Sequence, residues 1–171
     1  MKAKTSWLFL ALGLAVVLVA IDYEIKNLIV DNLTPFQVVN VIPGVLDLTL
    51  VTNNSAGFSI GFGFTPLFAI ISTLAALATI WFLFRVETLW WALLGGTFLG
   101  GIVGNLIDRF AREPYFGSGR VIDYMKVPFN FPIFNLADSL IVIVAILTVI
   151  AIMRGYRVGK AGKIESENGR D

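Results

Sequence analysis

The stretch "PIFNLADSLIVIVAILTVIAIM" (residues 132–153) decides the fold class of this chain. From Ser139 to Met153 it contains no charged residue, and a helix that crosses a bilayer needs roughly 20 mostly apolar residues. The stretch therefore predicts a membrane-spanning helix. Asp138 stands at its beginning, where a carboxylate is costly, and ionisable residues in membrane segments mark functional sites by default.

Three further stretches are apolar enough to span a membrane, and the composition agrees with them. They are residues 5–21, 66–84 and 88–107. Of the 171 residues 57% are hydrophobic and only 15% are charged, whereas soluble domains have roughly 25% charged residues. We therefore expect a membrane α-helical fold, a four-transmembrane-helix bundle that forms a single membrane domain over residues 1–158. The first stretch could also be a signal peptide, but it is long for one and no A-x-A sequence stands before Asp22.

The segment between the first two spans predicts a small β-sheet. Residues 38–64 are rich in β-branched and aromatic residues and are broken by Pro43-Gly44 and Asn53-Asn54, which is typical of short strands joined by turns. We expect a small extracytoplasmic β-sheet there, between the first and second helices.

Eight Lys and Arg residues lie on the side of the two termini and five on the other, so the positive-inside rule places both termini in the cytoplasm. Residues 159–171 are expected to form a flexible cytoplasmic tail.

The composition also limits the chemistry. The chain has no cysteine and no histidine, which excludes thiol nucleophiles, thiolate metal sites and a Ser–His pair. We expect no metal and no cofactor. The net charge of +1 argues against a nucleic-acid partner, which usually needs a basic face. An enzyme built from this chain must work with carboxylates, amides, hydroxyls, Lys or Arg.

Polar side chains gather near the predicted outer boundary of the spans. They are Asp22, Lys26, Asn53, Asn54, Asn105, Asp108, Arg109, Asp123, Asn135 and Asp138. Taken singly, several have an ordinary structural explanation. Asp22 and Lys26 could form an i,i+4 pair at a helix end, and Asn105 could hydrogen-bond between helices. Arg109 could reach lipid headgroups, Asp138 could be a first-turn acid of its helix, and Asp123 could be a solvated loop charge.

Taken together, these residues include two acids that could meet, Asp123 and Asp138. Two carboxyl groups held close together do not both ionise easily, so one pKa rises, the other falls, and the pair shares a proton. One member can then take a proton from water while the other hydrogen-bonds the carbonyl of a peptide bond. Such a pair hydrolyses peptides without a metal, a histidine or a covalent intermediate.

Five blocks of sequence, in order, resemble those of the lipoprotein signal peptidase (signal peptidase II) family, the membrane aspartic endopeptidases of bacteria. They are "IDYEIK" (21–26), "TNNSAGFS" (52–59), "GGIVGNLIDR" (100–109), "VIDY" (121–124) and "FNLADS" (134–139). The last three blocks are the ones that are specific to this family. The chain departs from the family in its long link "FAREPYFGSGR" (110–120), in Ser55 where the family has glycine, and in Tyr124 where phenylalanine is usual. These departures concern loop geometry and substrate gating.

The resemblance implies an activity and a set of site residues. Asp123 and Asp138 would be the catalytic dyad. Residues that line or support the site would be Asn53, Asn105, Arg109, Asn135, Asp22 and Lys26. The substrate would be a diacylglyceryl prolipoprotein, cleaved just before the lipidated cysteine at the outer boundary of the bacterial inner membrane. We expect a monomer whose other partner is membrane lipid.

Two other functions stay open at this point. A small proton-coupled transporter could use Asp123 and Asp138 as a relay, but it should have polar groups spread across the bilayer depth, whereas here the acids cluster at one end. A non-catalytic assembly protein could use Gly96, Gly100 and Gly104, whose spacing lets helices approach closely in lipid. That function leaves the ordered acid and asparagine blocks unexplained.

Overall fold

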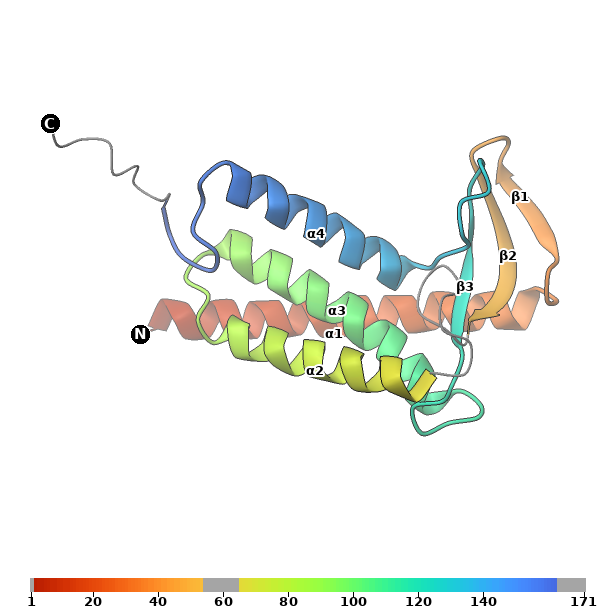
Figure 1. The fold of residues 1–171 in the computed structure, drawn as a ribbon, viewed down its shortest axis with the longest axis horizontal. Helices are drawn as coiled ribbons and strands as arrows, with labels where there is room; N and C mark the ends of the chain where they lie inside the picture. The colour runs from red at the N-terminus through yellow and green to blue at the C-terminus, as the bar shows by residue number, and fades with distance from the viewer. Residues whose placement is uncertain (1, 54–64, 163–171) are drawn as a thin grey trace, which may run out of the picture.

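The computed structural model describes residues 2–53 and 65–162, which form four helices with a small sheet at one end (Figure 1). The helices are α1 (Lys2–Asn32), α2 (Thr65–Leu83), α3 (Leu89–Ala111) and α4 (Leu136–Met153). All four are long and apolar enough to cross a membrane. The predicted fold class, a four-helix membrane bundle with a small sheet, is confirmed.

Helix α3 is the centre of the bundle and packs against the other three helices. Its glycines make this possible. A Cβ atom at Gly96 would lie 2.5 Å from the carbonyl oxygen of Ala11 in α1, and one at Gly101 would lie 2.7 Å from that of Ala137 in α4. The glycine pattern of the third span therefore marks close contacts with helices on two sides, as small residues allow in lipid.

Helix α1 continues well beyond the predicted span of residues 5–21, to Asn32. A helix of this length rises about 46 Å, more than the roughly 30 Å of a hydrocarbon core. Its last turns are held by the sheet, because Ile29 packs in a buried cluster with Leu50, Ile122 and Tyr124. Asp22 and Lys26, expected just after the span, therefore lie within the helix.

The other predicted helix ends also differ from the structure. Helix α3 continues past Ile107 to Ala111, and α4 begins at Leu136 and not at Pro132. Asn135 is the N-cap of α4, so the residues before it cannot belong to the helix. Phe134 instead forms an isolated antiparallel bridge with Met125, which ties the start of α4 to the sheet.

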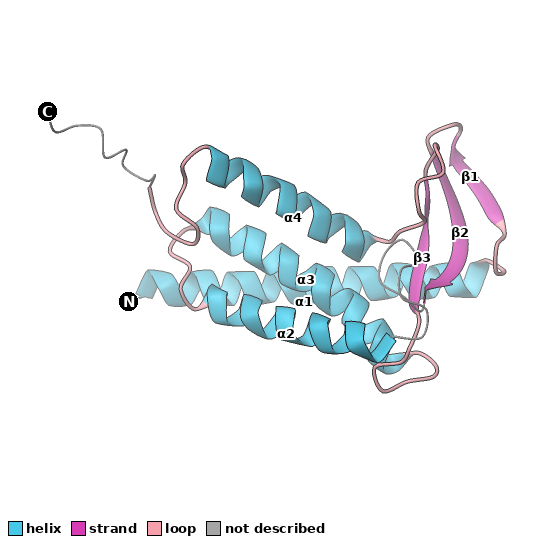
Figure 2. Ribbon diagram, viewed as in Figure 1, coloured by secondary structure: helices cyan, strands magenta, loops and turns pink. Residues whose placement is uncertain are grey.

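The sheet has three antiparallel strands in the order β1 (Val38–Ile42), β2 (Leu46–Asn53) and β3 (Val121–Lys126) (Figure 2). β1 and β2 fall in the predicted region, and residues 54–64 of that region lie outside the described residues. β3 comes from the connection between α3 and α4 and was not predicted. In the β2–β3 register Val51 pairs with Asp123 and Asn53 pairs with Val121, so the two segments meet where the polar residues lie.

The start of α1 and the segment after α4, residues 154–162, lie at the end of the bundle away from the sheet (Figure 1). The predicted flexible tail, residues 159–171, falls largely outside the described residues. Its first residues contact the α2–α3 connection, because the carbonyl of Gly159 accepts the N–H of Glu87 at 2.9 Å and Lys160 forms an ion pair with the Glu87 carboxylate at 2.9 Å.

Candidate active site

The start of α4 fixes the position of Asp138. The side chain of Asn135 accepts the Asp138 N–H at 3.0 Å, and Oδ2 of Asp138 accepts the Asn135 N–H at 3.2 Å. This reciprocal pair is a capping box, so Asp138 is indeed a first-turn acid. Its other oxygen, Oδ1, accepts a hydrogen bond from the side chain of Asn105 on α3 at 2.7 Å. The carboxylate is thereby held at the seam between α3 and α4.

Asp123 lies on β3 and is buried, with 3% of its surface exposed, so it is not a solvated loop charge. Its Oδ2 accepts the side-chain amide of Asn53 at 2.8 Å and its Oδ1 accepts that of Asn135 at 2.6 Å. Burial first, and then the nearby Asp138 carboxylate, raise the pKa of Asp123 from 3.8 to about 7, against the opposite effect of the two asparagine hydrogen bonds. Asp123 therefore holds a proton up to neutral pH.

The two carboxyl groups border one cavity of about 500 Å³. Asn135 links them, since its side chain donates to Asp123 and its backbone N–H donates to Asp138. The rest of the cavity wall is mainly apolar and comes from the segment before α4 and from its first turns: Phe131, Pro132, Ile133, Phe134, Ile141, Val142 and Ile143. An apolar hollow with a few convergent polar groups is the usual form of a ligand site.

Lys26 stands behind this cavity with none of its surface exposed. Its ammonium group forms ion pairs with Oδ2 of Asp22 at 2.7 Å and Oδ2 of Asp108 at 2.8 Å, and it donates a hydrogen bond to Oδ1 of Asn105 at 3.0 Å. Asp22 also accepts the backbone N–H of Ala137 at 3.1 Å. The i,i+4 pair of α1 therefore exists, but it is buried and joins α1 to α3 and α4.

Arg109 is buried and does not extend to the headgroups. It lines the cavity beside the two carboxyl groups, and its Nη1 donates to the backbone carbonyl of Asn105 at 3.1 Å. The structure thus brings all eight predicted site residues to the sheet end of the bundle. Five of them line the cavity: Asn53, Asn105, Arg109, Asp123 and Asp138. Asn135 bridges the carboxyl groups, and the Asp22–Lys26 pair supports Asn105 from behind.

Two charged residues were missing from the predicted site. Asp108 is fully buried, and its Oδ2 accepts the backbone N–H of Ile122, the residue before Asp123, at 3.3 Å. Its Oδ1 pairs with Nε of Arg112 at 2.6 Å. Asp108 therefore ties the strand that carries Asp123 to α3. The spacing of three residues from Asn105 and four to Arg112 was the available signal, since such residues share a helix face.

The site fits proton transfer between carboxyl groups. Because the chain has no histidine and no cysteine, a cluster of metal ligands would have to be built from acidic side chains. Within residues 2–53 and 65–162 there is no group of three or more acidic side chains that could hold a metal ion. One carboxyl group is buried and keeps its proton to about pH 7, while the other is half-buried at the cavity wall. Side-chain amides donate to both carboxyl groups, an arrangement that suits an acid and a base at one site.

Together the fold and the site define a polytopic membrane protein with one buried and one half-buried aspartate at the same cavity, the arrangement of a membrane aspartic endopeptidase. The family model of signal peptidase (SPase) II matches residues 14–154, and the chain belongs to this family. The resemblance seen in the sequence is therefore confirmed.

Relatives and solved structures agree with the family assignment. The chain is 38% identical to the lipoprotein signal peptidase of Leifsonia xyli subsp. xyli over 98% of its length and 77% of the relative. It is 36% identical to that of Mycobacterium leprae over 92% and 78%. Two bacterial membrane enzymes solved by the in meso method at 2.3 Å and 1.9 Å resolution have the same fold, with TM-scores of 0.77 and 0.73. Their sequences are 28% and 30% identical, covering 91% and 84% of this chain and 94% and 92% of theirs.

These findings establish the general activity. The chain is a protease of the bacterial signal peptidase II family, which removes signal peptides from prolipoproteins, and a multi-pass protein of the inner membrane.

Proposed function

We propose that this chain cleaves diacylglyceryl-modified prolipoproteins just before the lipidated cysteine, with Asp123 and Asp138 as the catalytic pair. One observation carries the proposal: both carboxyl groups border the same cavity and each accepts a hydrogen bond from Asn135. A shared donor holds two groups from distant parts of the chain in a fixed relation, as acid–base catalysis requires.

The difference between the two environments supports an assignment of the roles within this proposal. Asp123 carries the proton, because its pKa lies near 7, and hydrogen-bonds the carbonyl oxygen of the scissile peptide. Asp138 takes a proton from the water between them as the water oxygen bonds to the carbonyl carbon. Asp123 gives its proton to the developing alkoxide. The tetrahedral intermediate then collapses: one of its two hydroxyl groups returns a proton to Asp123 as the C=O bond re-forms, the C–N bond breaks, and the amine leaves with the proton that Asp138 received.

The remaining polar residues act as donors and supports. Asn53 holds Asp123 and Asn105 holds Asp138, so neither carboxyl group can rotate away from the water. Arg109 lines the same cavity, where its N–H groups can bind a backbone carbonyl of the substrate next to the scissile bond. The Asp22–Lys26 pair fixes Asn105. Preorganised donors of this kind need no rearrangement when charge develops.

A membrane-anchored substrate can enter the cavity from the side. The apolar wall at Ile141, Val142 and Ile143 belongs to a helix that faces lipid, and two of these three side chains are more than half exposed. A second, almost wholly apolar cavity of about 600 Å³ lies further along α3 and α4. Phe98 and Val144 are among the residues that line it, and α2 forms its other wall. An apolar signal-peptide helix fits this path. A transporter would need polar groups there.

The orientation and oligomeric state follow from the same proposal. Both termini lie in the cytoplasm and the sheet end faces outward, so that the carboxyl groups lie near the outer membrane boundary, where the modified cysteine is held by its lipid. The enzyme acts as a monomer, because one chain supplies both carboxyl groups and all their hydrogen-bond donors.

The test is cleavage of a purified diacylglyceryl prolipoprotein by Asp123→Asn and Asp138→Asn variants. An amide cannot exchange the shared proton, so each variant should lose about 10²- to 10⁴-fold in kcat. Asp31→Asn is the matched control, since Asp31 is an exposed carboxylate near the end of α1. It should cleave at the wild-type rate. Near-normal cleavage by either dyad variant, with correct insertion in the membrane, would overturn the proposed roles.

A further inference from the structure

A third cavity, with both apolar and cationic walls, lies at the opposite end of the bundle from the active site. Its volume is about 470 Å³, and it lies between the start of α3, the end of α4 and the segment that follows α4. Trp91, Leu147 and Ala151 line its apolar part, and Trp90, Arg154 and Lys160 line its rim. We propose that this cavity binds an anionic phospholipid of the leaflet at that end of the molecule.

The segment after α4, residues 156–162, forms one wall of the cavity, and specific contacts hold it in place. Backbone and side-chain bonds from Gly159 and Lys160 to Glu87 attach it to the α2–α3 connection. Gly159 has φ = 72° and lies against the ring of Phe82, where a Cβ atom would come within 2.9 Å of a ring carbon. Only glycine fits both conditions, so the sequence permits this close approach and the segment covers the inner end of the bundle.

The rim carries positive charge that the protein itself does not neutralise. Lys160 shares Glu87, but within the described part of the chain Arg154 makes no ion pair and its side chain makes no hydrogen bond. Arg154 is exposed at the end of α4. A guanidinium group binds a phosphate through two parallel N–H···O bonds. The rim therefore offers an anion site above an apolar floor.

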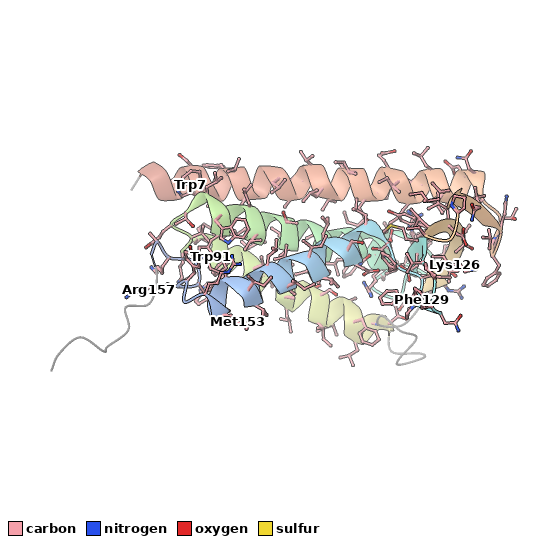
Figure 3. The ribbon with its side chains drawn as sticks, turned by 90° about the horizontal axis from the view of Figure 1, so that it is seen from above. Trp7, Trp91, Lys126, Phe129, Met153 and Arg157 are labelled. Atoms are coloured by element: carbon pink, nitrogen blue, oxygen red, sulfur yellow. The ribbon has the colours of Figure 1, made fainter. Side chains whose placement is uncertain are left out.

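The position of the cavity selects the kind of anion. Figure 3 shows Trp91, Met153 and Arg157 at the end of the molecule away from Lys126 and Phe129. The apolar helices end there, so the cavity lies at the boundary between hydrocarbon and headgroups, where half-exposed aromatic side chains such as Trp90 and Tyr156 are favoured. A free phosphate ion would leave the apolar floor unused, and a lipid without net charge would leave the Arg154 guanidinium uncompensated. An anionic phospholipid satisfies both parts.

The experiment is a lipid titration of the purified full-length protein in a neutral maltoside detergent, followed by native mass spectrometry. The probes are phosphatidylglycerol, phosphatidylcholine with the same acyl chains, and inorganic phosphate. We expect phosphatidylglycerol to bind the wild type more tightly than phosphatidylcholine. Arg154→Gln should weaken phosphatidylglycerol binding about fivefold, as loss of one cation at a lipid surface predicts. Millimolar phosphate should not displace the lipid.

Arg157→Gln is the matched control, because Arg157 is an exposed arginine three residues further along the chain that does not line the cavity. It should bind phosphatidylglycerol as the wild type does. Equal losses in the two variants would show diffuse attraction to basic residues and overturn the site. Equal binding of the two lipids by the wild type, which requires no variant to fold, would overturn it as well, and so would displacement by phosphate. Prolipoprotein cleavage in detergent should be unchanged by Arg154→Gln, so this test does not depend on the catalytic proposal.

Discussion

At the scale of single residues, Asp138 shows how a carboxylate is kept at the start of a membrane helix. It caps α4 through Asn135 and borders the cavity at the same time. Burying a charged group is costly unless it is hydrogen-bonded, and Asp138 accepts bonds from Asn105 and from the Asn135 backbone. The structural role and the role in the site are therefore compatible, because the carboxylate has two oxygens and each serves one neighbour.

The raised pKa of Asp123 predicts the pH dependence of cleavage. Because Asp123 must be protonated to act as the acid and its pKa is about 7, kcat/KM should fall as the pH rises above about 7. The hydrogen bond from Asn53 lowers this pKa, so Asn53→Ala should raise it and move the alkaline limb to higher pH. The measurement is the pH profile of kcat/KM for both enzymes.

The control for this prediction is Asn40→Ala on β1. Asn40 also donates its side-chain amide to an aspartate, Asp47, but at the exposed edge of the sheet, so its loss should leave the limb unchanged. An alkaline limb that moves to lower pH in Asn53→Ala would assign the titration to a different group.

The raised pKa of Asp123 also affects the stability of the protein. The folded state binds the Asp123 proton more tightly than the unfolded chain does, so this contribution to the free energy of unfolding is lost as the pH rises from about 4 to about 7.

At the scale of elements, the approach of three helices around Gly104 positions the support of the site. A Cβ atom there would lie 2.7 Å from Oδ2 of Asp22 and 3.3 Å from the Cβ of Ala137. Gly104→Ala should therefore displace α1 or α4 and lower the free energy of unfolding by about 1–3 kcal/mol, the usual cost of overpacking. Cleavage should fall with it, since Asp22 holds Lys26. Thermal unfolding in detergent and the cleavage rate measure the two effects.

Gly13→Ala provides the comparison for Gly104→Ala. Gly13 also lies within a membrane helix, α1, but a Cβ atom there would meet no other atom within 4 Å. The substitution should leave the melting temperature the same or slightly higher, because alanine is the better helix residue. If both substitutions have equal effects, helix approach at Gly104 is not what positions the site.

The elements also show what could be predicted from the sequence and what could not. Apolar runs predicted all four helices, because burial in lipid depends on local composition. The end of α1 could not be placed, because its last turns are held by contacts with Leu50 and Ile122 in the sheet. β3 was missed because its six residues pair with a strand about 70 positions earlier. The site residues followed from ordered motifs, and the helical spacing of Asp108 gave a local signal for its pair with Arg112, but its contacts with Lys26 and the Ile122 N–H are tertiary.

At the scale of the whole molecule, the two ends of the bundle differ in their chemistry. The carboxyl groups, the asparagines and the sheet are at one end, and the start of α1 and the segment after α4, with Arg154, Arg157 and Lys160, are at the other. Exposed cations occur at both ends, but more Lys and Arg residues belong to the end away from the sheet, and the positive-inside rule therefore predicts that this end lies in the cytoplasm. The catalytic proposal also requires the sheet end to lie on the outer side of the membrane. The charge distribution and the catalytic proposal therefore predict the same orientation, and one experiment tests both.

The absence of cysteine from the chain makes orientation directly measurable with single-cysteine variants. Lys126 and Arg157 are both exposed cations at opposite ends of the molecule (Figure 3). In intact spheroplasts a membrane-impermeant maleimide should label the Lys126→Cys variant, and it should label the Arg157→Cys variant only after permeabilisation. Cleavage of the precursor by both variants would show that they are folded and inserted. The reverse labelling pattern would place Asp123 and Asp138 at the cytoplasmic boundary, where a signal-peptide cleavage site at the outer leaflet is out of reach.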